Sequence, residues 1–210
     1  MKQLLFATIL LLSGCSSRPV NKRLNANIER VISLNIHNHI NSPLDQQKTS
    51  AVVNEENHIL AAAAYVNNQP IISLRINWIK DEPFSTTSCN ILKSVLANPE
   101  PSIDTVDVHI FDSITCCSGP DTNFVGCSGT VLPTAVLAPQ NTPTLRAVQW
   151  LHELGHNRGL KHRNENGALM YETPTSGFRK LDDCEYQGFL SANPGVDCRN
   201  KSGGSLLQAR

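Results

Sequence analysis

Four residues in the C-terminal half of the chain have the types and spacing needed to hold a metal ion and activate water. His152 and His156 are four residues apart, so a helix would stack both imidazoles on one face, about 6 Å apart along its axis. Glu153 follows the first histidine directly, close enough to meet a water molecule beside the ion. This pattern predicts a helix that carries two metal ligands and a general base.

A catalytic zinc site needs a third protein ligand and an open position for water. Gly159 stands where the helix would end, and glycine can adopt the left-handed conformation that reverses the chain. His162 can then return as the third ligand. These residues therefore predict a zinc ion held by His152, His156 and His162.

A second short segment, Ala168-Leu169-Met170-Tyr171, follows the histidines. Together the two segments resemble the metzincin metalloproteases, whose pattern is His-Glu-x-x-His-x-x-Gly-x-x-His followed by a methionine turn beneath the metal. Met170 matches that methionine. The turn is most similar to the matrixin version, although Glu172 stands where a proline is common, and the resemblance covers about Pro143 to Tyr171.

The resemblance implies a fold and an activity. The fold would be a zincin-like α+β domain: a twisted mixed sheet of about five strands with a long helix packed on it, an active-site helix and a C-terminal helix. The activity would be zinc-dependent endopeptidase chemistry, because zinc lowers the pKa of bound water towards about 7 and polarises a peptide carbonyl. Glu153 would take the proton of the water and pass it to the leaving amine.

Two other residues near the predicted metal are expected to have packing roles. Met170 is expected to form the floor of the site, because a thioether is a poor match for a zinc ion already served by three imidazoles. Tyr171 is expected to form a wall, with assistance to the oxyanion as the alternative. By resemblance, a peptide would lie extended along an edge strand within 123–131, and the segment 171–177 would wall the main specificity pocket.

Two alternatives to the peptidase stay open. One is a non-catalytic, zinc-containing envelope lipoprotein that serves as a binding module, although the presence of Glu153 argues against a lost activity. The other is a zinc hydrolase that acts on a non-peptide amide, since the same water and base would serve. No nucleic-acid partner is expected, because 18 Lys and Arg balance 18 Asp and Glu and leave no bulk positive field.

The first residues of the chain predict export. Lys2 precedes an apolar run from Leu4 to Leu12, which is far shorter than the roughly 20 residues of a membrane-spanning helix. The end of this run, through Cys15, resembles a bacterial lipobox, so residues 1–14 are predicted to be a lipoprotein signal peptide and Cys15 to be lipidated. An ordinary cleavable signal is the alternative. Ser16 resembles the outer-membrane sorting pattern, if the host has two membranes.

A lipid on Cys15 would anchor the protein to the cell envelope, with residues 15–28 as a tether and 29–210 as one catalytic domain. Seven cysteines less Cys15 leave an even set, and disulfides are expected outside the cytoplasm. The preferred local pair is Cys184 with Cys198. The remaining four form a second group: Cys89, Cys116, Cys117 and Cys127.

Hydrophobic periodicity predicts the elements that must position these residues. Strands are expected at 32–40, 71–79 and 103–111, with a short edge strand followed by another within 123–138. Helices are expected at 45–67, at about 91–96, from Pro143 after the capping residue Thr142, and at 181–192, with Asp182 and Asp183 in its first turn.

The remaining histidines lack the spacing of the metal motif. They are interpreted as surface or core residues: His37, His39, His58 and His109.

Overall fold

The computed structural model describes residues 28–39, 44–82, 93–94, 97, 102–112, 114, 126–128, 134–137, 142–172, 180–191 and 196–199. All the predicted metal ligands and Glu153 lie within these ranges. The predicted signal peptide, Cys15 with nearly all of the tether, most of the short helix near 91–96, and residues 173–179 of the pocket wall lie outside them. In the described part of the chain, no helix combines the length and the apolar character that crossing a membrane requires.

A five-stranded sheet forms the frame of the domain, in the order β2-β1-β3-β5-β4. Its strands are β1 (Ile28–His39), β2 (Ile71–Asp81), β3 (Thr105–Phe111), β4 (Gly126–Cys127) and β5 (Thr134–Leu137). All neighbouring strands are parallel except β4, which runs antiparallel to β5 at the edge. The predicted mixed α+β fold and the two short strands of 123–138 are therefore confirmed.

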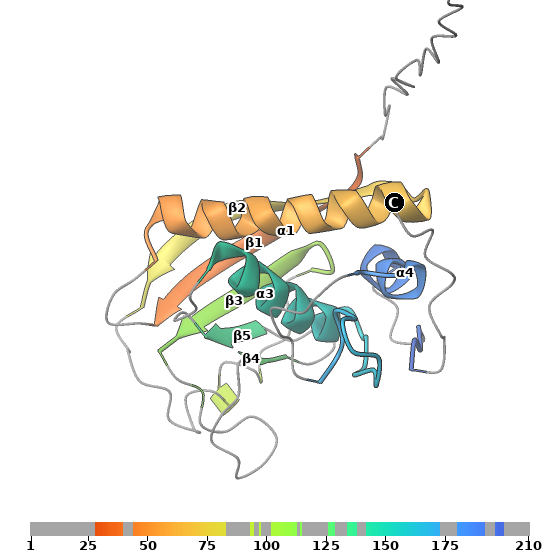
Figure 1. The fold of residues 1–210 in the computed structure, drawn as a ribbon. Coiled ribbons are helices and arrows are strands. Elements are labelled where there is room, and N and C mark those ends of the chain that lie inside the picture. The colour runs from red at the N-terminus through yellow and green to blue at the C-terminus, as the bar shows by residue number, and fades with distance from the viewer. Residues whose placement is uncertain are drawn as a thin grey trace, which may run out of the picture.

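Alternation along β1 separates the two faces of the sheet, because successive strand side chains point to opposite sides. Ile32, Leu34 and Ile36 are almost completely buried, and they belong to the same apolar core as the helix residues. The alternate positions, among them Asn35 and His37, therefore lie on the other face. Figure 1 shows α1 (Gln46–Asn67) and α3 (Pro143–Asn157) together on one side of the sheet.

Helix α1 begins and ends at residues whose chemistry suits these positions. The Asp45 carboxylate accepts a hydrogen bond from the backbone N–H of Lys48 at 2.8 Å, which satisfies an otherwise unpaired donor of the first turn. Asn68 closes the helix in the left-handed conformation, with φ at 52°. The prediction of a long helix over 45–67 is confirmed.

Helix α3 carries the motif and has the predicted start and end. The Thr142 hydroxyl accepts a hydrogen bond from the N–H of Leu145 at 3.2 Å, and Pro143 occupies the first turn. The helix ends at Asn157, and Gly159 follows with φ at 88°. That left-handed residue reverses the chain towards His162, as the sequence predicted.

Helix α4 (Asp183–Ser191) is shorter than the predicted span of 181–192. Asp182 lies before the helix and not in its first turn, because its carboxylate accepts a hydrogen bond from the N–H of Glu185 at 3.0 Å and so caps the helix. Glycine at 188 lets α4 pack closely on Leu160, since a Cβ there would lie 2.4 Å from that side chain. The predicted disulfide between Cys184 and Cys198 is present.

Strand β3 also starts later than predicted. The expected strand covered 103–111, whereas the observed strand begins at Thr105. A turn precedes it, in which the N–H of Thr105 donates to the Ser102 carbonyl at 3.2 Å, and Ile103 is 43% exposed. Ile103 therefore does not extend the buried alternation of the strand.

Candidate metal centre and active site

The three histidines of the motif meet at one point beside the end of α3. The Nε2 atom of His162 lies 3.3 Å from Nε2 of His152 and 3.0 Å from Nε2 of His156. Nitrogen ligands about 2.0–2.1 Å from a tetrahedral zinc ion are separated by about 3.3 Å. The planes of the three rings meet at 32° to 89°, so the rings approach this point from different directions.

Backbone carbonyls fix the orientation of two of these rings. Nδ1 of His152 lies 2.8 Å from the Leu169 carbonyl oxygen, and Nδ1 of His156 lies 2.9 Å from the Leu160 carbonyl oxygen. A carbonyl only accepts, so each Nδ1 carries the proton and each Nε2 keeps a lone pair for a metal. Both acceptors lie in the chain that follows the helix, and the sequence motif did not identify them.

The electrostatics also favour metal binding over protonation. Burial, together with the neighbouring His156, lowers the pKa of His152 to about 3, and burial lowers the pKa of His156. Neutral imidazoles are the form that binds a metal. The three converging Nε2 atoms fit a zinc ion, and a fourth position is available because His162 is exposed.

Glu153 lies in a buried position between α3 and the edge strand β4. Only 4% of the residue is exposed, and a Cβ added to Gly126 of β4 would lie 2.3 Å from its Cγ and Oε1 atoms. Glycine at 126 therefore creates the space that the carboxylate side chain occupies. Burial raises the pKa of Glu153 to about 8, and a cation held by the adjacent histidines would favour the ionised form.

Met170 packs directly under α3. Its side chain is completely buried, and a Cβ on Gly155 would lie 2.4 Å from its sulfur atom. Gly155 thus allows the turn at 168–171 to approach the helix between its two histidines. Tyr171 is partly exposed, and its N–H donates to the Ala168 carbonyl at 3.3 Å within the same turn.

A buried charge network supports this turn from below, and the sequence analysis did not identify it. Glu185 of α4 accepts a hydrogen bond from the N–H of Met170 at 3.0 Å and lies 3.5 Å from the Arg163 guanidinium. Arg163 follows His162 directly, donates its N–H to the Met170 carbonyl at 2.7 Å, and also pairs with Asp182. The network joins the third histidine, the methionine turn and α4.

The structure also gathers three of the histidines that the sequence analysis treated separately. His37, His39 and His109 offer nitrogen atoms that all lie within 4.8 Å of one another, whereas the side chain of His58 is 80% exposed on α1. The sequence carried one signal for this grouping: positions 37 and 39 lie on the same face of a strand.

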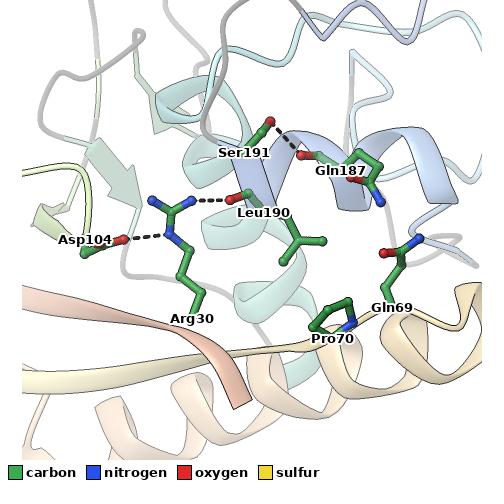
Figure 2. Close-up of a pocket in the computed structure, with 7 residues that line it drawn as sticks. All are labelled: Arg30, Gln69, Pro70, Asp104, Gln187, Leu190 and Ser191. Carbon is green, nitrogen blue, oxygen red and sulfur yellow. Dashed lines mark hydrogen bonds and ion pairs between the residues drawn. The ribbon is translucent and has the colours of Figure 1, made fainter. Parts of the chain in front are cut away.

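A pocket of about 550 Å³ near the start of β1 contains none of these histidines (Figure 2). Its guanidinium group, from Arg30, is already bonded to Asp104 at 2.6 Å and to the Leu190 carbonyl. The pocket therefore adds no candidate catalytic group to the centre on α3.

Comparisons with known proteins agree with the fold. No protein-family model and no curated protein matches the chain. Among solved structures, the chain is similar to metalloproteinase-II from Bacteroides fragilis, with a TM-score of 0.51 and 11% identity over 81% of this chain and 55% of that one. It is also similar to archaemetzincin from Methanopyrus kandleri, with a TM-score of 0.47 and 14% identity over 77% of this chain and 94% of that one.

The chain thus spans about half the length of the Bacteroides fragilis protein. At these identities the likeness concerns the fold alone, and only the first TM-score exceeds 0.5. The protein therefore has an α+β fold similar to that of a known metalloproteinase, with a histidine centre that fits zinc.

Proposed function

We propose that this protein is a zinc-dependent endopeptidase. The observation that carries the proposal is the convergence of three Nε2 atoms beside a buried carboxylate, with His152, His156 and His162 as ligands and Glu153 as general base. A bound zinc ion would lower the pKa of water and polarise a carbonyl group.

The residues of the chain supply the proton transfers. Glu153 accepts a proton from the attacking water as the oxygen forms a bond to the carbonyl carbon. The same carboxyl group then donates that proton to the nitrogen as the carbon–nitrogen bond breaks, so one side chain serves as base and acid. Burial beside Gly126 holds the carboxylate in one place, so little reorganisation is needed before reaction.

The edge strand β4 supports a peptide as the substrate. It pairs with β5 on one side and ends the order of the described sheet. An extended peptide could therefore add to its outer side by main-chain hydrogen bonds. Because Gly126 of this strand contacts Glu153, such a peptide would pass close to the general base.

We also infer that the protein is exported and anchored through a lipid on Cys15. The disulfide between Cys184 and Cys198 supports export, since disulfides persist mainly outside the reducing cytoplasm. Fractionation of cells that express the chain and its Cys15→Ser variant checks the anchor: the parent chain should stay with the membranes, and recovery of both proteins in the soluble fraction would contradict it.

The peptidase proposal is tested by comparing the parent chain with Glu153→Gln, both zinc-loaded, on a mixed peptide library read by mass spectrometry. Loss of a general base should slow cleavage by about 10²- to 10⁴-fold, while zinc content stays unchanged. Glu55→Gln is the matched control: this carboxylate of α1 accepts a hydrogen bond from Thr144 in the first turn of α3, away from the histidines, and the variant should cleave normally.

Cleavage that Glu153→Gln leaves unaffected would overturn the mechanism. A zinc content far below one ion per chain in the parent protein would overturn the metal centre. Absence of peptide cleavage by every variant, with zinc bound, would favour the non-peptide amide or the binding module over the peptidase.

A further inference from the structure

A second histidine cluster lies on the opposite side of the sheet from the helices. His37 and His39 come from β1 and His109 from the neighbouring strand β3, where it pairs in register with His37. Since Ile36 and Ile110 of the same strands face the helix-covered core, these histidines point to the other face. We call His37, His39 and His109 the sheet cluster.

The sheet cluster is compact and largely shielded from water. Nε2 of His39 lies 2.9 Å from Nδ1 of His109, and the candidate ligand atoms of all three residues lie within 4.8 Å of one another. His39 and His109 are 4% and 8% exposed. Imidazole nitrogens at such separations can reach one ion with small side-chain rotations.

Carboxylates surround the third member in the arrangement that often supports a metal-binding histidine. Glu82 Oε1 lies 2.8 Å from Nδ1 of His37, so this carboxylate orients the ring and leaves Nε2 as the ligand atom. Nε2 of His37 is buried and has no hydrogen-bond partner in the described part of the chain. The Asp107 carboxylate lies 4.0 Å from that atom.

We propose that His37, His39 and His109 bind a second divalent transition-metal ion, separate from the centre on α3. Imidazole ligands favour Zn²⁺, Ni²⁺ or Cu²⁺ over Mg²⁺ or Ca²⁺. The ring of His37 lies nearly parallel to that of His109, at 8°, so binding turns it out of this stack. The bound ion links β1 to β3 and stabilises the folded state.

The proposal is tested by metal counting on the full chain. The protein is loaded with Zn²⁺, dialysed against metal-free buffer and analysed by mass spectrometry for zinc per chain. We expect two ions in the parent chain, one in His37→Gln and one in His109→Gln. His58→Gln, a change at an exposed histidine outside both clusters, should keep two ions.

A further variant leaves the sheet cluster unchanged and separates this proposal from the proposed peptidase activity. The double variant His152→Gln/His162→Gln removes the centre on α3 and should still bind one ion, with the visible absorption of nitrogen-coordinated Co²⁺ when cobalt is the probe. If this double variant binds no ion, the sheet cluster is not a metal site. The same conclusion follows if the parent chain binds only one ion and His37→Gln still binds it. His37→Gln should still cleave peptides.

Discussion

The protein contains two clusters of three histidines that differ in how their rings are arranged. In the cluster on α3, ring planes meet at angles of 32° to 89°, whereas rings of the sheet cluster lie within 8° to 23° of parallel. In the first cluster the nitrogens already surround one point. In the second the rings must turn before they can do so.

The backbone explains this difference. A helix followed by a reversed chain brings side chains to a common point from several directions, as His152, His156 and His162 do. Parallel strands instead project neighbouring side chains in nearly the same direction, which stacks His37 on His109 with centroids 4.1 Å apart. Because its ligands are already in place, the centre on α3 should bind a metal ion more tightly than the sheet cluster.

Among changes that keep Glu153 and both sets of histidines, the largest expected effect comes from Gly126→Ala, which disturbs the general base. The added Cβ would lie 2.3 Å from the Glu153 side chain, so the carboxylate must move. Displacing a catalytic group by about 1 Å costs roughly 10²-fold in rate. Peptide cleavage should fall by about that factor, with two zinc ions still bound per chain.

Gly188→Ala is the matched control for this change. It also adds one carbon against a buried side chain, here Leu160, and should cost about 1–3 kcal/mol of stability. Its effect on the rate per folded molecule should be much smaller. Equal losses of rate in the two variants would show that Gly126 acts only through stability.

A smaller effect is expected from Glu185→Gln, which tests the support beneath the methionine turn. Burial, opposed by the hydrogen bond from Met170 and by Arg163, raises the pKa of Glu185 from 4.5 to about 7. The folded protein therefore keeps a proton that the unfolded chain releases, so this residue lowers stability as pH rises from about 4.5 to about 7.

The glutamine variant should lack this contribution. Relative to the parent chain, its free energy of unfolding should increase by a few kcal/mol across that pH range, as measured by denaturant unfolding at saturating zinc. A difference between the two proteins that is independent of pH would contradict the proposed protonation of Glu185.

The smallest effect is expected from Glu82→Gln, which changes the carboxylate beside His37 of the sheet cluster. Burial raises the pKa of Glu82, but hydrogen bonds from His37 and Lys80 outweigh it, and the net shift is downward. Glu82 thus contributes stability above about pH 4.5, which is lost as pH falls through its folded pKa. Its pH dependence should be opposite in sign to that of Glu185.

Loss of this carboxylate should lower the zinc affinity of the sheet cluster by about 10-fold, since Glu82 supports a ligand and is not itself a ligand. Competition with a chelator measures the affinity of each ion separately. An unchanged zinc affinity at the sheet cluster would count against the supporting role of Glu82. A lower zinc affinity at the centre on α3 would also count against it.

Local sequence signals predicted much of the fold and one of the two clusters. The helix ends at Asp45, Thr142 and Gly159 were predictable, because capping and chain reversal depend on nearby residues. Two predicted bounds were wrong: the strand begins at Thr105 and not at Ile103, and Asp182 caps α4 instead of lying in its first turn. Both bounds depend on backbone hydrogen bonds, in the turn before the strand and in the helix cap. The roles predicted for residues outside the described ranges, including lipidation of Cys15, stay predictions.

By itself, the sequence determined the centre on α3, because all its ligands lie within eleven consecutive residues and one helix with one glycine positions them. Only the tertiary structure decided the sheet cluster, since His37 and His109 are distant in the chain and meet through strand pairing. The tertiary structure also decided which residues support the centre on α3. Gly126 of β4 and Glu185 of α4 reach that centre only through packing between distant segments. Contacts between distant segments leave no fixed spacing in a sequence.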